Sequence, residues 1–143
     1  FFRSPAFPAG SGPNYVNAAI TLETSLSADA LLAHLHRVEA VFGRVREARW
    51  AARTLDLDLL DYGGRILPDA ATVTHWVDLP LERQKNDAPD RLILPHPRIQ
   101  DRAFVLIPLA DIAPDWVHPL SGRSLADMLS ALPDAEKGTI CPL

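Results

Sequence analysis

The residues with the clearest chemical potential lie in RWAARTLDLDLLDYG, residues 49–63, where leucine and aspartate alternate. Successive side chains of a β-strand point to opposite faces, so the leucines would anchor this strand to a core. Asp56 and Asp58 would then share the other face, roughly 6 to 7 Å apart. Two carboxylates this close repel each other unless a cation lies between them, and Mg²⁺ prefers carboxylate and phosphate oxygens. The alternation therefore allows a metal site, but by itself it favours an ordinary strand with one solvated face, because Asp-x-Asp spacings are common by chance.

Arginines gather immediately before these acids, in a chain whose formal net charge is −4. They are Arg44, Arg46, Arg49 and Arg53. Guanidinium groups bind phosphate oxygens through a planar fork of donors and stay charged. Cations beside paired carboxylates fit a polyphosphate that is bridged through metal, and Trp50 would be placed to stack on a flat ring. An ordinary cluster of ion pairs and a packed tryptophan are the alternatives that the residues leave open.

The composition sets bounds on the rest of the molecule. With 143 residues and 48% apolar side chains, the chain suits one compact domain with a core. Its sequence pI of about 5.7 argues against a general binder of nucleic acid or of anionic membranes. No stretch approaches the ~18 consecutive apolar residues of a membrane span. The single cysteine, Cys141, closes no internal disulfide and favours a reducing compartment, which we take to be the cytoplasm.

Alternation and helical spacing predict the elements of the first half. Phe1–Arg3 would end a strand, and residues 15–23 would form another. Its core face would carry Val16, Ala18, Ile20 and Leu22. Residues 27–43 predict a helix with Ser27 as N-cap and Gly43 at its end. Its core-facing stripe would be Leu31, Leu35, Val38 and Phe42, with His34 and His36 facing solvent.

The second half has fewer periodic signals. Residues 54–62 would be the acidic strand, and residues 65–90 an irregular surface excursion. Order resumes in AFVLIPLADI, where Pro108 argues against a regular central strand. GRSLADMLSAL predicts a short helix with Ser124 as N-cap and Pro133 beyond its end.

Two long motifs carry a resemblance to a known family. GRVREARWAARTLDLDLLDYG followed by LPHPRIQDRAFVLIPLADIAP resembles the 6-hydroxymethyl-7,8-dihydropterin pyrophosphokinases of folate biosynthesis. Upstream, FFRSPAFPAGSGPNYVNAAITLET is similar to the family's pterin-loop segment, so the likeness extends from residue 1 to about residue 130. Ala51 and Ala52 replace a common Gly-Pro, Pro97 replaces an aromatic residue of some members, and residues 72–90 are longer than the usual link.

The resemblance implies an α+β fold, a ferredoxin-like antiparallel sheet with helices packed on it. It also implies that residues 1–143 are a single pyrophosphokinase domain that is incomplete at its N-terminus. The family opens with a strand and a helix before the segment that matches Phe1, and that strand is normally central in the sheet. Its absence would leave sheet edges and apolar surface uncovered.

The resemblance further implies that ATP, as co-substrate, gives its β,γ-diphosphate in one step to the hydroxymethyl oxygen of the pterin, releasing AMP. Two Mg²⁺ ions would bridge the triphosphate. The partners would be these two small molecules, without nucleic acid or membrane. The protein would be a cytoplasmic monomer, alone or joined or adjacent to other folate enzymes.

Site residues transfer to matching positions only. The resemblance assigns metal binding to Asp56 and Asp58, and catalysis to this pair with Arg44, Arg46 and Arg53. It assigns ATP binding to Glu39, Arg44, Arg46, Arg53, Arg91, His96 and Arg102. It assigns pterin binding to Ser4, Pro5, Phe7, Tyr15, Asn17, Trp50 and Phe104.

Unaided chemistry agrees with part of this assignment. Asn17 has the paired donor and acceptor that an amide-like ring edge requires, and Trp50 and Phe104 could enclose a flat ring. Two other functions remain open at this stage. One is a pterin- or nucleotide-binding module without turnover, and the other is a different Mg²⁺-dependent nucleotide hydrolase.

Overall fold

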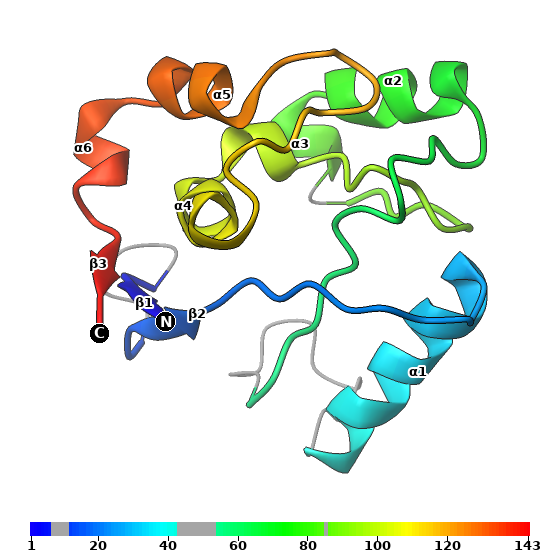
Figure 1. Ribbon diagram of the computed structural model, residues 1–143, viewed down its shortest axis with the longest axis horizontal. Coiled ribbons are helices and arrows are strands. Elements are labelled where there is room, and N and C mark those ends of the chain that lie inside the picture. Colours follow the sequence, from blue (N-terminus) through cyan, green and yellow to red (C-terminus); the bar gives the residue numbers. More distant parts are fainter. Residues whose placement is uncertain (7–11, 43–53, 85) are drawn as a thin grey trace.

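A computed structural model describes residues 1–6, 12–42, 54–84 and 86–143 of the protein (Figure 1). It is a small α+β structure in which one antiparallel sheet and several helices share the chain. The elements are β1 (Phe2–Ser4), β2 (Tyr15–Asn17), α1 (Ala28–Val41), α2 (Ala70–Asp78), α3 (Leu81–Gln84), η1 (Ile99–Asp101), α4 (Ala103–Ile112), α5 (Leu125–Ala131), α6 (Asp134–Lys137) and β3 (Cys141–Pro142). Figure 1 shows α4 between the sheet and α5, with α1 on the right of the view, across the molecule from the sheet.

The described sheet has three antiparallel strands in the order β2-β1-β3. Phe2 pairs with Asn17 and with Pro142, so the C-terminal strand lies beside the N-terminal one. The predicted strand at 15–23 is confirmed only over Tyr15–Asn17, because the chain beyond it has no neighbouring strand among the described residues.

The predicted core face of residues 15–23 is wrong. Ile20 and Leu22 keep 73% and 51% of their surface exposed, and Val16 is exposed as well. Ala19, from the opposite set, packs against the main hydrophobic cluster. Burial does alternate from residue 16 to residue 20, but the apolar side chains of this segment did not reveal which face would meet the core.

Helix α1 confirms the helix predicted from residues 27–43. Ser27 Oγ accepts a hydrogen bond from the Ala30 amide at 3.2 Å, which satisfies one donor of the first turn. Leu31 is buried, whereas Phe42, at the other end of the expected stripe, is 57% exposed. Within the described chain α1 contacts no other helix or strand, so its apolar stripe is covered only by extended chain.

The main core lies where α4 packs on α5 and η1. Its buried members are Ile99, Ala103, Leu106, Leu109, Leu125, Met128 and Leu132. Pro108 lies inside α4, where it removes one backbone donor from the helix. As predicted, no described strand runs through Pro108. Ser124 caps α5 as predicted, because its Oγ accepts a hydrogen bond from the Asp127 amide at 3.1 Å.

The irregular excursion expected at residues 65–90 is wrong, because this stretch contains α2 and α3. Asp69 Oδ1 accepts a hydrogen bond from the Thr72 amide at 2.8 Å and starts α2. Val73 is fully buried and holds that helix to the rest of the structure. The threonines and valines of α2 have modest helix propensity, so this cap and tertiary burial decide its structure. None of the described helices is long and apolar enough to cross a membrane.

His118 gives the fold a testable pH dependence. It is buried, and its Nδ1 accepts hydrogen bonds from the Leu120 and Ser121 amides, both at 3.3 Å. Burial lowers the pKa of His118 below its ordinary 6.5, and the nearby Asp61 carboxylate only partly opposes this. Below about pH 6.5 the unfolded chain therefore binds more protons than the folded one, and stability falls as the pH decreases.

We expect His118→Asn to reduce this pH dependence, because an amide oxygen can accept the same bonds and does not titrate. Urea unfolding of both proteins at pH 7 and pH 5 measures the difference. Replacing the exposed His75 by Asn is the matched control and should leave the pH dependence unchanged. Equal loss of stability toward pH 5 in wild type and His118→Asn would contradict the assignment.

Candidate functional site

The acidic segment (residues 54–61) is extended and alternates as its sequence predicts. Asp56 and Asp58 are exposed, while Leu55, Leu57 and Leu59 are half-buried. The expectation that this segment is a β-strand is wrong for the described chain, because no strand pairs with it. Hydrogen bonds to other parts of the described chain hold it instead. The Leu57 amide donates to Glu39 Oε1 at 2.7 Å, and the Leu60 carbonyl accepts from the His96 amide at 2.8 Å.

The bond at Leu60 joins the two motifs of the sequence. It places His96, from the Pro-His-Pro turn, beside the acidic segment. A second link joins the same two parts of the chain: Leu67 and Leu94 exchange backbone hydrogen bonds of 2.8 and 2.9 Å. The acids and His96 are therefore brought together by backbone contacts, which do not depend on the charged side chains themselves.

Asp58, His96 and Arg102 form one electrostatic cluster. Burial lowers the pKa of His96 below 6.5, while the Asp58 carboxylate opposes the shift and Arg102 adds to it. Burial likewise lowers the pKa of Arg102, and again Asp58 opposes the shift, with a smaller contribution from Asp56. The cluster thus combines the acidic side chains of Asp58 and Asp56 with the imidazole of His96 and the guanidinium of Arg102. Arg98 approaches from the same turn and pairs with Asp101 at 2.9 Å.

A cavity of about 610 Å³ opens beside this cluster. Its lining combines side chains of α1, of the acidic segment and of the Pro-His-Pro turn: Asp29, Leu32, His36, Leu57, Asp58, Leu59, Pro89, Asp90, Arg91, Leu92, Ile93, His96 and Pro97. Its size and mixed lining suit a small organic ligand with an anionic part.

His36 was missed as a site residue. It is half-buried and lines the cavity, contrary to the expectation that it faces solvent, whereas His34 is exposed as expected. The signal was present in the spacing, because Asp29, Leu32 and His36 fall on one face of a helix. What the sequence did not reveal is that a cavity lies against that face.

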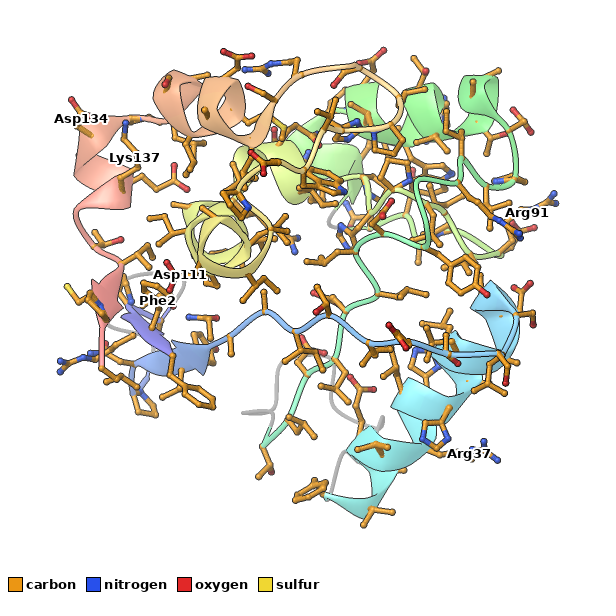
Figure 2. All side chains as sticks on the ribbon, in the orientation of Figure 1. Phe2, Arg37, Arg91, Asp111, Asp134 and Lys137 are labelled. Atoms are coloured by element: carbon orange, nitrogen blue, oxygen red, sulfur yellow. The ribbon has the colours of Figure 1, made fainter. Side chains whose placement is uncertain are left out.

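Arg91 and Glu39 occupy opposite surroundings. Arg91 lies at the outer edge of the molecule, exposed and paired with Asp90 at 3.2 Å (Figure 2). A rim position leaves it able to meet a ligand from solvent. Glu39 is completely buried under the acidic segment and is not among the residues that line the cavity.

The predicted pterin residues that the structure describes lie on or next to β1, on β2 and at the start of α4. The Asn17 amide nitrogen donates to the Oγ of the buried Ser4 at 2.8 Å, which fixes the orientation of Asn17. Tyr15, Pro5 and Phe104 are exposed, and both strands contact α4. The Arg102 guanidinium lies 5.6 Å from the centre of the Phe104 ring, so the nucleotide-side and pterin-side sets meet at the start of α4.

Six predicted residues lie outside the described part of the chain. They are Phe7, Arg44, Arg46, Arg49, Trp50 and Arg53. Their roles stay predictions.

The donor set of the acidic segment fits Mg²⁺. Among the described residues no group of three or more His, Cys, Asp or Glu side chains could hold a metal ion. A pair of exposed carboxylates suits a hard ion that keeps waters and takes its other ligands from a bound phosphate. It does not suit zinc, which needs a complete set of nitrogen and sulfur donors.

Comparison of the sequence with known proteins identifies the family of the chain. The sequence profile of the 7,8-dihydro-6-hydroxymethylpterin-pyrophosphokinase (HPPK) family matches residues 1–114. The chain belongs to the HPPK family. The acidic segment, the Pro-His-Pro turn and α4 all fall inside the HPPK match, whereas α5, α6 and β3 lie beyond it.

Individual HPPK relatives extend the likeness. The 2-amino-4-hydroxy-6-hydroxymethyldihydropteridine pyrophosphokinase of Synechocystis is 43% identical over 90% of this chain and 55% of its own length. The protein of the same name from Pseudomonas aeruginosa is 41% identical over 93% of this chain and 68% of its own length. The Pneumocystis carinii folic acid synthesis protein fol1 is 33% identical over 91% of this chain but only 15% of its own length. The chain thus spans between about half and two thirds of the first two relatives.

Proposed function

We propose that the domain transfers the β,γ-diphosphate of ATP to the hydroxymethyl oxygen of 6-hydroxymethyl-7,8-dihydropterin, giving AMP and the pterin diphosphate in folate biosynthesis. In this step the bond between the α,β-bridging oxygen and the β-phosphorus breaks, and the pterin oxygen forms a bond to that phosphorus. The names of the Synechocystis and Pseudomonas relatives support the reaction. The observation that carries it is that Asp58 interacts electrostatically with His96 and Arg102 and, with His96, lines a cavity of ligand size.

The nucleotide would lie in the cavity between α1 and the Pro-His-Pro turn. Leu32 and Pro97 offer apolar surface for the base. Arg102, which interacts electrostatically with Asp58 of the cavity lining, offers a cation for the phosphates. Asp56 and Asp58 would hold two Mg²⁺ ions, which when bound supply charge neutralisation and alignment of the phosphates. His96, whose pKa is lowered, stays neutral and can donate or accept a hydrogen bond without adding charge. Positioning of this kind supplies most of the rate in phosphoryl-type transfer.

The pterin would lie at the start of α4. Asn17, oriented by Ser4, offers a donor and an acceptor to the edge of the ring. Phe104 offers an exposed aromatic face within reach of the same strands. The contact of Arg102 with the Phe104 ring would couple the two substrates, because Arg102 would contact phosphate and Phe104, two residues later, would contact pterin.

The setting of the domain is part of the proposal. We infer a cytoplasmic protein that acts on small molecules as a monomer, or as a part of a longer folate enzyme. The fol1 relative supports the second arrangement, since this chain matches only 15% of its length.

The deciding experiment incubates the protein, in the form in which the cell produces it, with ATP, Mg²⁺ and 6-hydroxymethyl-7,8-dihydropterin. Chromatography should show AMP and pterin diphosphate in equal amounts, and AMP only when the pterin is present. Binding of both ligands without AMP would identify a non-catalytic module. Nucleotide cleavage without pterin would identify a hydrolase.

We also propose that the complete sheet is ferredoxin-like and that a further extended strand lies between residues 18–24 and the acidic segment. A cavity of about 600 Å³ separates these two extended stretches, and Ile20, Leu22, Leu57 and Leu59 line it. Asp61 Oδ1 is buried at this cavity without a hydrogen-bond partner in the described structure, as expected of an acceptor that awaits a backbone amide. An inserted strand would also cover the apolar stripe of α1.

Hydrogen exchange tests this strand. In residues 1–143 alone, the amides of residues 18–23 should exchange rapidly, while those of Leu67 and Leu94 are protected by their mutual bonds. In the form that the cell produces, the proposal expects residues 18–23 to gain protection by about 10²-fold or more. Unchanged fast exchange there would refute the inserted strand without affecting the proposed reaction.

A further inference from the structure

Glu39 stands apart from the other acidic residues of the site. It lies in the last turns of α1, and its side chain is completely buried. Its Oε1 accepts a hydrogen bond from the Leu57 backbone amide at 2.7 Å. A carboxylate that accepts an amide hydrogen at this distance forms a charge-assisted bond, roughly twice as strong as a neutral one. Burial of so polar a group under this segment is costly unless the bond is made.

The position of this hydrogen bond lets it affect the orientation of the proposed metal ligands. Leu57 is the residue between Asp56 and Asp58, so the peptide units on both sides of it carry the two carboxylates. The acidic segment has no neighbouring strand in the described chain to fix the rotation of these units. The Leu57 amide therefore determines in which direction Asp56 and Asp58 project, and Glu39 holds that amide.

We propose that Glu39 is a positioning residue that acts through the Leu57 amide, aligning Asp56 and Asp58 for the metal-bound nucleotide. This inference rests on the proposed function, and it differs from direct ATP binding by Glu39. Two observations favour the indirect role: Glu39 is fully buried, and the cavity is lined by Leu57 and Asp58 but not by Glu39. The side chain thus contacts the backbone of the segment without reaching the surface of the cavity.

Three variants separate a hydrogen-bonding role from the alternatives. Glu39→Gln keeps an oxygen at the same reach and removes the charge, whereas Glu39→Ala removes both. Arg37→Ala is the matched control, because Arg37 lies on the same helix, is exposed and points away from the site (Figure 2). Thermal unfolding of each protein is measured first, and all assays are run well below the lowest midpoint.

The first readout is the dissociation constant of α,β-methylene-ATP in the presence of Mg²⁺, measured by isothermal titration calorimetry. This analogue cannot release its diphosphate. We expect Glu39→Ala to weaken this binding by about 10- to 100-fold, as loss of the partners of metal ligands does. Glu39→Gln should stay within about fivefold of wild type, because a neutral oxygen makes the same bond at lower strength. The second readout is the Leu57 amide in ¹⁵N spectra, which should exchange faster in Glu39→Ala and stay protected in Glu39→Gln.

Each outcome decides the inference. Equal losses of nucleotide binding in Glu39→Gln and Glu39→Ala would overturn it, since the charge of Glu39 and not its hydrogen bond would then be essential. Unchanged binding in Glu39→Ala would also overturn it. If Glu39→Ala does not fold, wild-type binding by Glu39→Gln with a protected Leu57 amide supports the inference, and weakened binding overturns it. If wild type binds the nucleotide but forms no AMP with pterin present, the proposed reaction fails while the binding and amide measurements still judge Glu39.

Discussion

Asp58→Ala is expected to lower kcat/KM for the formation of pterin diphosphate by about 10³-fold or more, while the protein stays folded. The expected loss corresponds to several kcal/mol of metal-dependent stabilisation of the transition state. Asp58 interacts electrostatically with both His96 and Arg102, whereas Asp56 makes only a smaller contribution at Arg102. Because the side chain is exposed, its removal creates no cavity in the core.

Stability should change little in Asp58→Ala, since the loss of repulsion from Asp56 is offset by the loss of attraction to Arg102. Urea unfolding and the steady-state rate at several Mg²⁺ concentrations measure both expectations. Asp115→Ala, at an exposed aspartate of a turn, is the matched control and should change neither quantity. Activity within tenfold of wild type in Asp58→Ala at ordinary Mg²⁺ would contradict the assignment of Asp58 to the metal.

Leu106→Ala is expected to have the opposite profile, a large loss of stability with little direct effect on the chemistry. Leu106 is fully buried at the centre of the cluster formed by α4, α5 and η1. Loss of a leucine side chain from such a place costs about 2 to 5 kcal/mol, because the cavity that remains is only partly filled. The urea midpoint should fall without a change in the slope of the transition.

Two controls define this result. Ile112→Ala lies on the same helix but starts 40% exposed, so its loss should be clearly smaller. Leu106→Met conserves volume and should cost less than about 1.5 kcal/mol. A loss below 1 kcal/mol in Leu106→Ala would show that α4 is not packed as described. Since α4 carries Arg102 and Phe104, the site depends on this core for its geometry.

The sequence by itself determined the family of the protein and the face on which its two acids lie. The alternation of leucine and aspartate predicted that the acids would share the exposed face, and the burial of residues 55–59 agrees. Its two motifs identified the family, and the family profile confirms it. Helix α1 and the cap of α5 were also predictable, because helical spacing and an N-cap serine are local properties.

Only the tertiary structure decided which surfaces these elements cover. Ile20 and Leu22 belong to the more apolar face of residues 15–23, yet the chain turns Ala19 toward the core instead. Helix α2 has weak local propensity and forms because Asp69 caps it and Val73 is buried. The cavity that His36 lines and the hydrogen bond from the Leu57 amide to Glu39 both form between segments that are far apart in sequence. Local patterns record the period of an element and the type of its side chains, whereas burial depends on what packs against it, which a single segment does not encode.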